Sequence, residues 1–123
     1  MSFPIREEDT IDWKVIATVD HWLDENVDNK YKTQPLAQDW ARIAKVIEEL
    51  GEVIRALIAY TGQNPRKPID HVADMKMLEE LCDTALTSIL ALQHFTKDTG
   101  TVREMLRDKQ VLIYQRMMNV NDS

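Results

Sequence analysis

Apolar residues recur at spacings of three and four along the middle of the chain, and this periodicity restricts the fold more than any other feature. Between residues 38 and 60 the series runs Trp40, Ile43, Ile47, Leu50, Ile54 and Leu57. Such spacing places the side chains on one face of an α-helix, whereas a half-buried strand would need alternation. The pattern is typical of a helix packed in a bundle.

The same periodicity predicts three further helices, over residues 10–26, 71–96 and 101–118. Gly and Pro punctuate the segments between these helices, and no segment alternates as a strand would. The simplest fold that buries the four apolar faces is all-α, an antiparallel four-helix bundle. At 123 residues, the chain is expected to form one domain over residues 1–123. The N-terminal arm, residues 1–8, and the tail, residues 119–123, are expected to be flexible.

Composition excludes several classes of protein. With 15 Lys and Arg against 21 Asp and Glu, the net charge is −6, which disfavours binding to a nucleic acid polymer through its phosphates. No apolar run approaches the ~20 residues of a membrane span. The single cysteine, Cys82, cannot form an internal disulfide, and this fits a reducing compartment. We therefore expect a cytoplasmic protein with no membrane partner.

Two pairs of carboxylates do not fit a purely structural bundle. Glu49 and Glu52 lie three residues apart in the second predicted helix, and Glu80 and Asp83 have the same spacing in the third. Residues at i and i+3 share one side of a helix, and like charges at this spacing are destabilising. Gly51 adds a cost of roughly 1 kcal/mol against alanine in a helix interior. Several unfavourable choices at neighbouring positions indicate a functional site.

One acidic pair alone is more often solvated than functional, but two pairs in consecutive helices favour a shared cation site. The ligand set is all oxygen, which suits Mg²⁺, Mn²⁺ or Ca²⁺ rather than zinc. A di-iron bundle needs Glu-x-x-His pairs, and the sequence has none. Because Mg²⁺ keeps waters or substrate phosphates in its coordination shell, an acidic groove holding it suggests a polyphosphate substrate.

The acidic motifs resemble those of a known enzyme family. The segment Lys45–Val53, with the sequence KVIEELGEV, followed by Glu80–Asp83, with the sequence ELCD, resembles the MazG-like all-α nucleoside triphosphate pyrophosphohydrolases. Their signature is Glu-Glu-x-x-Glu on one helix and Glu-x-x-Asp on the next. The resemblance extends from about Trp40 to Ile89 and includes the intervening loop, residues 61–67.

This resemblance implies hydrolysis of an NTP or dNTP between the α and β phosphates, which gives the monophosphate and pyrophosphate. Matched to the motifs, Glu49, Glu52, Glu80 and Asp83 are the expected ligands of Mg²⁺, with Mn²⁺ as a possible substitute. Glu48 matches the leading glutamate and is assigned a catalytic role in orienting water or the metal shell. The motif does not identify the general base or the preferred nucleobase.

Basic residues are expected to hold the phosphates that the metal does not coordinate. Lys45 shares a helix side with Glu49, and a salt bridge between the two is an equally good interpretation. Arg66 and Lys67 lie in the loop between the acidic helices, where solvated charges are also common.

The second and third predicted helices carry apolar residues around more than half of their circumference, which is wider than one bundle core needs. Relatives in the family assemble as dimers or tetramers, so we expect a homodimer or homotetramer. The alternative to an enzyme is a non-catalytic helical interaction or regulatory module that retains a metal site.

Overall fold

The computed structural model describes residues 10–26 and 34–122, and within these ranges it contains four helices and no strand. This confirms the predicted all-α class. The helices are α1 (Trp13–Asn26), α3 (Pro35–Thr61), α4 (Ala73–Thr96) and α5 (Thr99–Asp122). The expected flexible arm, residues 1–8, lies outside the described residues. Among the described helices, none has the length and apolar character needed to cross a membrane.

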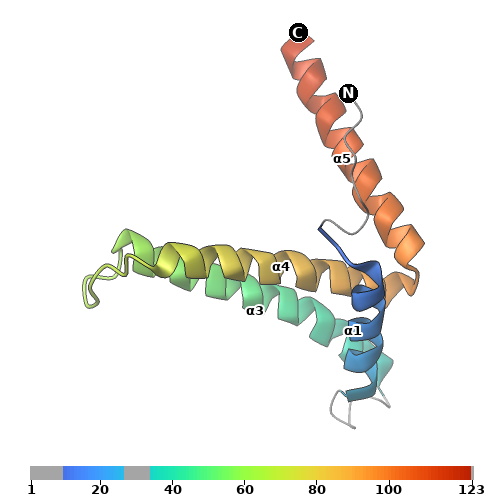
Figure 1. The fold of residues 1–123 in the computed structure, drawn as a ribbon, viewed down its shortest axis with the longest axis horizontal. Coiled ribbons are helices and arrows are strands. Elements are labelled where there is room, and N and C mark those ends of the chain that lie inside the picture. The colour runs from blue at the N-terminus through green and yellow to red at the C-terminus, as the bar shows by residue number, and fades with distance from the viewer. Residues whose placement is uncertain (1–9, 27–33, 123) are drawn as a thin grey trace.

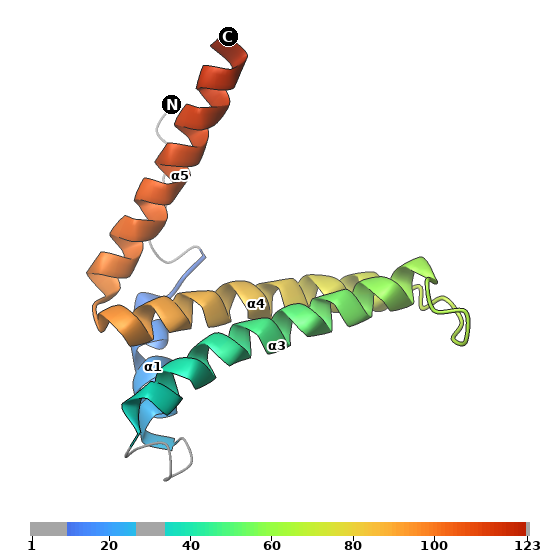
Figure 2. The same cartoon turned by 180° about the vertical axis from the view of Figure 1, so that it is seen from behind.

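Helices α3 and α4 form a long antiparallel hairpin, which makes most of the contacts between helices (Figure 1). Helix α1 packs across one end of this hairpin, where α3 begins and α4 ends. Helix α5 leaves the same end and extends away from the hairpin, as Figure 2 shows from behind. Val102, near the start of α5, is fully buried, whereas residues 107–119 are all exposed. The arrangement is therefore an open one, with a hairpin flanked by two helices at one end.

Short polar side chains define where helices α1 and α5 begin. The Asp12 carboxylate accepts hydrogen bonds from the backbone N–H groups of Lys14 and Val15 at 3.0 and 3.2 Å. Asp12 therefore caps α1, which begins three residues after the predicted start at residue 10. The carboxylate of Asp98 accepts from the backbone N–H groups of Gly100 and Thr101 at the start of α5 in the same way.

The ends of the hairpin helices follow from Pro and Gly chemistry. Helix α3 begins at Pro35, three residues before the predicted start, because proline is favoured in the first turn of a helix. It ends at Thr61 and is capped by Gly62, whose φ of 71° lies in the left-handed region. Helix α4 begins at Ala73, two residues later than predicted. The Asp70 carboxylate accepts a hydrogen bond from the Val72 backbone N–H at 3.1 Å, in the turn before the helix.

The apolar face expected to form the bundle core is largely exposed on the described chain. Trp40 is 74% exposed and Ile47 is 66% exposed, although both belong to the apolar series of α3. The residues of α3 that are buried are instead Arg42, Val53 and Ala56. The hairpin thus buries the side of α3 next to the acidic pair and leaves the apolar series open.

Candidate metal centre and adjoining cavity

Three of the four expected metal ligands meet between the hairpin helices. Glu49 from α3 and Glu80 and Asp83 from α4 each offer a carboxylate oxygen, and these oxygens all lie within 4.8 Å of one another. Only 14% of the Glu49 side chain is exposed, while Glu80 is half-buried and Asp83 is exposed. The antiparallel pairing of α3 and α4 therefore brings together acidic groups that are about 30 residues apart in sequence.

The negative charge of this cluster is only partly balanced among the described residues, since Lys45 forms an ion pair with Glu49. Partial burial of the Glu80 carboxyl raises its pKa above the ordinary value, and the charges of Asp83, Glu49 and Glu52 raise it further. Lys76 opposes this shift in pKa but does not outweigh it. A divalent cation would relieve the repulsion that raises the pKa.

The fourth expected ligand, Glu52, lies beside this group rather than within it. Its oxygens contact Arg55, with Arg55 Nη1 at 3.3 Å from Oε1 and 3.4 Å from Oε2. Its charge nevertheless acts on Glu80. Glu52 therefore faces the same groove, one helical turn from Glu49.

Lys45 and Glu48 lie at the opposite edge of the cluster. Lys45 Nζ is 3.2 Å from Glu49 Oε1 and 3.3 Å from Glu48 Oε1. Hydrogen bonds to Glu49 and Glu48 raise the Lys45 pKa above its ordinary value, against a smaller opposing effect of burial. The salt bridge considered from the sequence is therefore present. The side chain of Glu48 is 62% exposed, so it lies at the rim of the site.

A cavity of about 560 Å³ adjoins the carboxylates toward the tip of the hairpin. Glu52 and Lys76 belong to its wall, and both act electrostatically on Glu80. The loop before α4 supplies a further wall, which includes Lys67. Lys67 thus lines a cavity beside the carboxylates, whereas Arg66 does not line it. The Arg66 backbone N–H donates a hydrogen bond to Asn64 Oδ1 at 3.0 Å.

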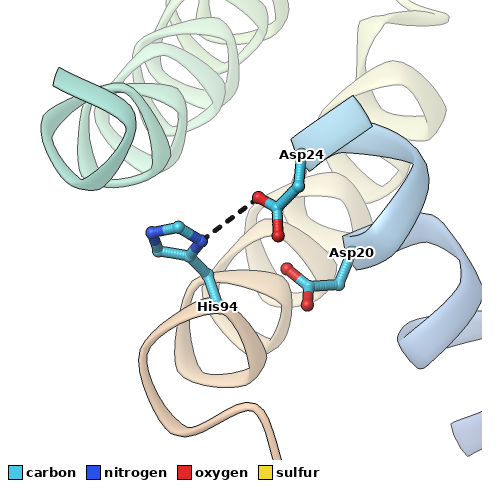
Figure 3. A group of neighbouring side chains, drawn as sticks. All are labelled: Asp20, Asp24 and His94. Atoms are coloured by element: carbon cyan, nitrogen blue, oxygen red, sulfur yellow. Dashed lines mark ion pairs between the residues drawn. The ribbon is translucent and has the colours of Figure 1, made fainter. Parts of the chain in front are cut away.

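A second polar cluster lies at the other end of the hairpin and was not anticipated from the sequence. Asp20 and Asp24 of α1 point toward His94 of α4, as Figure 3 shows, and one oxygen or nitrogen of each lies within 4.8 Å of the others. Arg42 Nη2 is 2.9 Å from Asp24 Oδ1 and 3.2 Å from Asp20 Oδ1. Lys97 Nζ is 2.6 Å from Asp24 Oδ2 and 3.0 Å from Asp20 Oδ2.

This second cluster fits a structural role better than a metal. Arg42 and Lys97 already place two positive charges against the Asp20 and Asp24 carboxylates, where a metal ion would have to compete with them. His94 Nε2 is engaged with Asp39 at 2.7 Å. We therefore interpret the cluster as the charged network that fixes α1 to the hairpin.

Sequence signals for this network exist in hindsight. Asp20 and Asp24 follow the buried Ile16 at intervals of four, so they share its side of α1. Arg42 precedes Val46 by four residues and Val53 by eleven, which places it on the buried side of α3. Charged residues at apolar-face positions indicate buried ion pairs, because a buried charge needs a partner.

The first cluster passes the chemical test for a hard divalent cation. Its oxygens come from carboxylates alone, which suit Mg²⁺ or Mn²⁺. Ligands on one Mg²⁺ lie about 3–4 Å apart, so oxygens within 4.8 Å need only small side-chain rotations.

Comparisons of this chain with models of protein families, with curated proteins and with solved structures gave no match.

Proposed function

We propose that this protein is a Mg²⁺-dependent nucleoside triphosphate pyrophosphohydrolase of the MazG-like kind. It would cleave an NTP or dNTP between the α and β phosphates and release the monophosphate and pyrophosphate. One observation carries the proposal. Glu49, Glu80 and Asp83, chosen from two sequence motifs, have carboxylate oxygens within 4.8 Å of one another across two helices.

The residues of the site have distinct tasks in this proposal. Glu49, Glu80 and Asp83 hold Mg²⁺, and Glu52 extends the acidic surface by one turn for a further ligand or water. A divalent cation held by these carboxylates would supply Lewis-acid chemistry for phosphate hydrolysis. Glu48, at the exposed rim, orients the attacking water.

Cations on both sides of the carboxylates complete the proposed phosphate site. Lys45 is held beside Glu49 by its salt bridge, at a position where a lysine can stabilise charge on a transferred phosphate. Lys67 lies in the loop wall of the cavity that Glu52 also lines, where it could bind a phosphate that extends from the metal. Arg66 remains a weaker candidate, because it is exposed outside that wall.

We further propose that the bundle is completed by a second copy of the chain. On α3, Trp40 is 74% exposed and Ile47 is 66% exposed. Large exposed apolar surfaces mark sites of protein–protein contact.

The exposed apolar series of α3 has the spacing of a helix–helix seam. It alternates steps of four and three over three heptads, as in coiled coils. Its members are Leu36, Trp40, Ile43, Ile47, Leu50, Ile54 and Leu57, and each is at least 42% exposed. A second α3 hairpin packed on this seam gives the homodimer or homotetramer expected from the sequence.

The test of the enzymatic proposal is product analysis. The protein is incubated with Mg²⁺ and a panel of ribo- and deoxyribonucleoside triphosphates, and monophosphate and pyrophosphate are quantified. Glu49→Gln and Asp83→Asn should each reduce turnover at least about 100-fold, since each removes a metal ligand. Glu79→Gln is the matched control, because Glu79 is an exposed neighbour of Glu80 on α4 outside the cluster.

Orthophosphate as the direct product would refute cleavage between the α and β phosphates. A protein that binds Mn²⁺ but turns over no triphosphate would instead match the non-catalytic helical module. For the assembly, light scattering coupled to size exclusion should give a mass of twice 14.3 kDa or more. Ile47→Lys should shift that mass toward the monomer, whereas a monomeric wild type would refute the proposed dimer.

A further inference from the structure

The cavity at the tip of the hairpin is lined by apolar and cationic residues that are not needed to bind a metal ion. It combines an apolar floor and wall with a cationic edge and holds about 560 Å³, within the range of small-molecule sites. We propose that this cavity binds the base of a purine nucleotide, so that the substrate is a purine rather than a pyrimidine nucleoside triphosphate. This inference rests on the proposed function for the identity of the phosphate chain.

The cavity lies beside the carboxylate cluster, because residues of its wall are within one helical turn of the cluster. Glu52 lines the cavity, and it is on the same helix side as Glu49, three residues away. Lys76 lines the cavity four residues before Glu80, so it lies one turn away on α4. A nucleotide could therefore place its phosphates at the carboxylates and its base in the cavity, nearer the tip of the hairpin.

Small side chains keep the cavity open. Ala56 and Ala59 from α3 and Ala73 from α4 line it, and these positions carry the shortest side chain that has a Cβ atom. Pro68, Ile69 and Val72 form an apolar wall from the loop. A flat aromatic ring between such surfaces gains dispersion and removes apolar area from water.

The edge of the cavity can recognise the polar rim of a base. Arg55 and Lys67 offer donors, and the Asp70 carboxylate offers an acceptor. The guanidinium of Arg55 can also stack on an aromatic face. The site thus has donors and acceptors together with an apolar floor, which is the mixture that fixes a heterocycle in one orientation.

The size of the cavity favours a two-ring purine base over a one-ring pyrimidine base. A second cavity of about 220 Å³ lies next to the first and shares Arg55, Ala59 and Lys67 with it. A one-ring base would cover less of the apolar wall around this volume and would leave more of it to water, so it removes less apolar area from water. A purine fills more of it, so the purine should be preferred by roughly tenfold or more in kcat/KM, a discrimination typical of apolar pockets.

The experiment compares purine and pyrimidine substrates within each variant, so that the fraction of folded protein cancels. The ratio of kcat/KM for ATP and GTP to that for CTP and UTP is measured with Mg²⁺ for the wild type and for Ala59→Leu. Ala59 is half-buried, so leucine there narrows the cavity without replacing the fully packed Ala56. Ala59→Leu should lower the purine preference by about tenfold. Ala17→Leu, on the exposed surface of α1, should leave the ratio unchanged.

A second measurement separates this inference from the proposed function. Binding of AMP and of CMP is measured by calorimetry in the presence of Mg²⁺, without turnover. If triphosphates are hydrolysed but pyrimidines react as well as purines, the inference fails and the proposed function stands. If no triphosphate is hydrolysed but AMP binds more tightly than CMP and Ala59→Leu removes that difference, the purine cavity stands and the proposed function fails.

Discussion

Replacement of Arg42 by methionine should destabilise the protein strongly, because Arg42 contacts two carboxylates and a backbone carbonyl of α1 at the junction with the hairpin. Its Nη2 donates to the Asp20 carbonyl at 3.1 Å and to the Asp24 carboxylate at 2.9 Å. It also forms an ion pair with the Asp20 carboxylate at 3.2 Å. The side chains of Arg42 and Asp20 are only 9% and 5% exposed, so water cannot replace the lost partner.

The expected loss of stability can be estimated, because the buried Asp20 carboxylate would keep only one of its two cationic partners. Removing one member of a buried ion pair costs about 3–5 kcal/mol. Lys97 Nζ remains 3.0 Å from Asp20, so we expect the low end, about 3 kcal/mol. For a chain of this length, about 3 kcal/mol lowers Tm by roughly 10–15 °C.

The assay is thermal and urea unfolding followed by circular dichroism, at one protein concentration because assembly would shift the apparent Tm. Arg55→Met is the matched control. Arg55 also forms an ion pair, with Glu52, but its side chain is 77% exposed, so the change should stay within about 0.5 kcal/mol.

A double variant tests whether the buried charge is the cause. Arg42→Met with Asp20→Leu removes both members, and replacing a buried pair by apolar residues is often neutral or stabilising. The double variant should therefore be more stable than Arg42→Met alone. The reasoning is refuted if Arg42→Met stays within 1 kcal/mol of the wild type, or if the second substitution lowers stability further.

Four other outcomes are expected. Gly62→Ala should cost at least about 1–2 kcal/mol of unfolding free energy, because φ is 71° and the added Cβ would lie 2.5 Å from Ile69 Cγ1. Gly51→Ala meets nothing within 4 Å on the described chain and should stabilise by about 0.5–1 kcal/mol in urea titration. A loss of stability there would instead place a second chain against α3. Burial alone would raise the pKa of Asp24, but hydrogen bonds from Lys97 and Arg42 hold that pKa below its ordinary value. This contribution to stability is therefore present above the unfolded pKa and lost as pH falls through the folded one, so Tm measured from pH 5 down to pH 2 should drop less in Lys97→Met. The pKa of Glu80 is raised, so its effect on stability changes with pH in the opposite direction. In the metal-free protein, the contribution of Glu80 to stability is lost as pH rises through its folded pKa. Mg²⁺ should remove this dependence of stability on pH. If the cluster binds no metal, the dependence should be the same with and without Mg²⁺.

Local interactions explain what the sequence determined. The helical class and the i, i+3 placement of Glu49 with Glu52 and of Glu80 with Asp83 depend on periodicity within single helices. Because two such pairs carry an unfavourable charge arrangement, their convergence could be expected before the fold was known. The predicted helix boundaries agree with the structure to within four residues, and the largest difference is the later end of α5 at Asp122.

Only the tertiary structure shows which side of each helix packs against another helix and which side is exposed. The amphipathic pattern of α3 indicates an apolar face, but it does not say whether that face meets another helix of the same chain. In the structure α4 packs against the side of Arg42 and Val53, and Trp40 and Ile47 stay exposed. Burial depends on pairing between distant segments, whereas helix formation depends on hydrogen bonds four residues apart. For the same reason the network of Arg42 with Asp20 and the cavity beside Glu52 required the assembled helices.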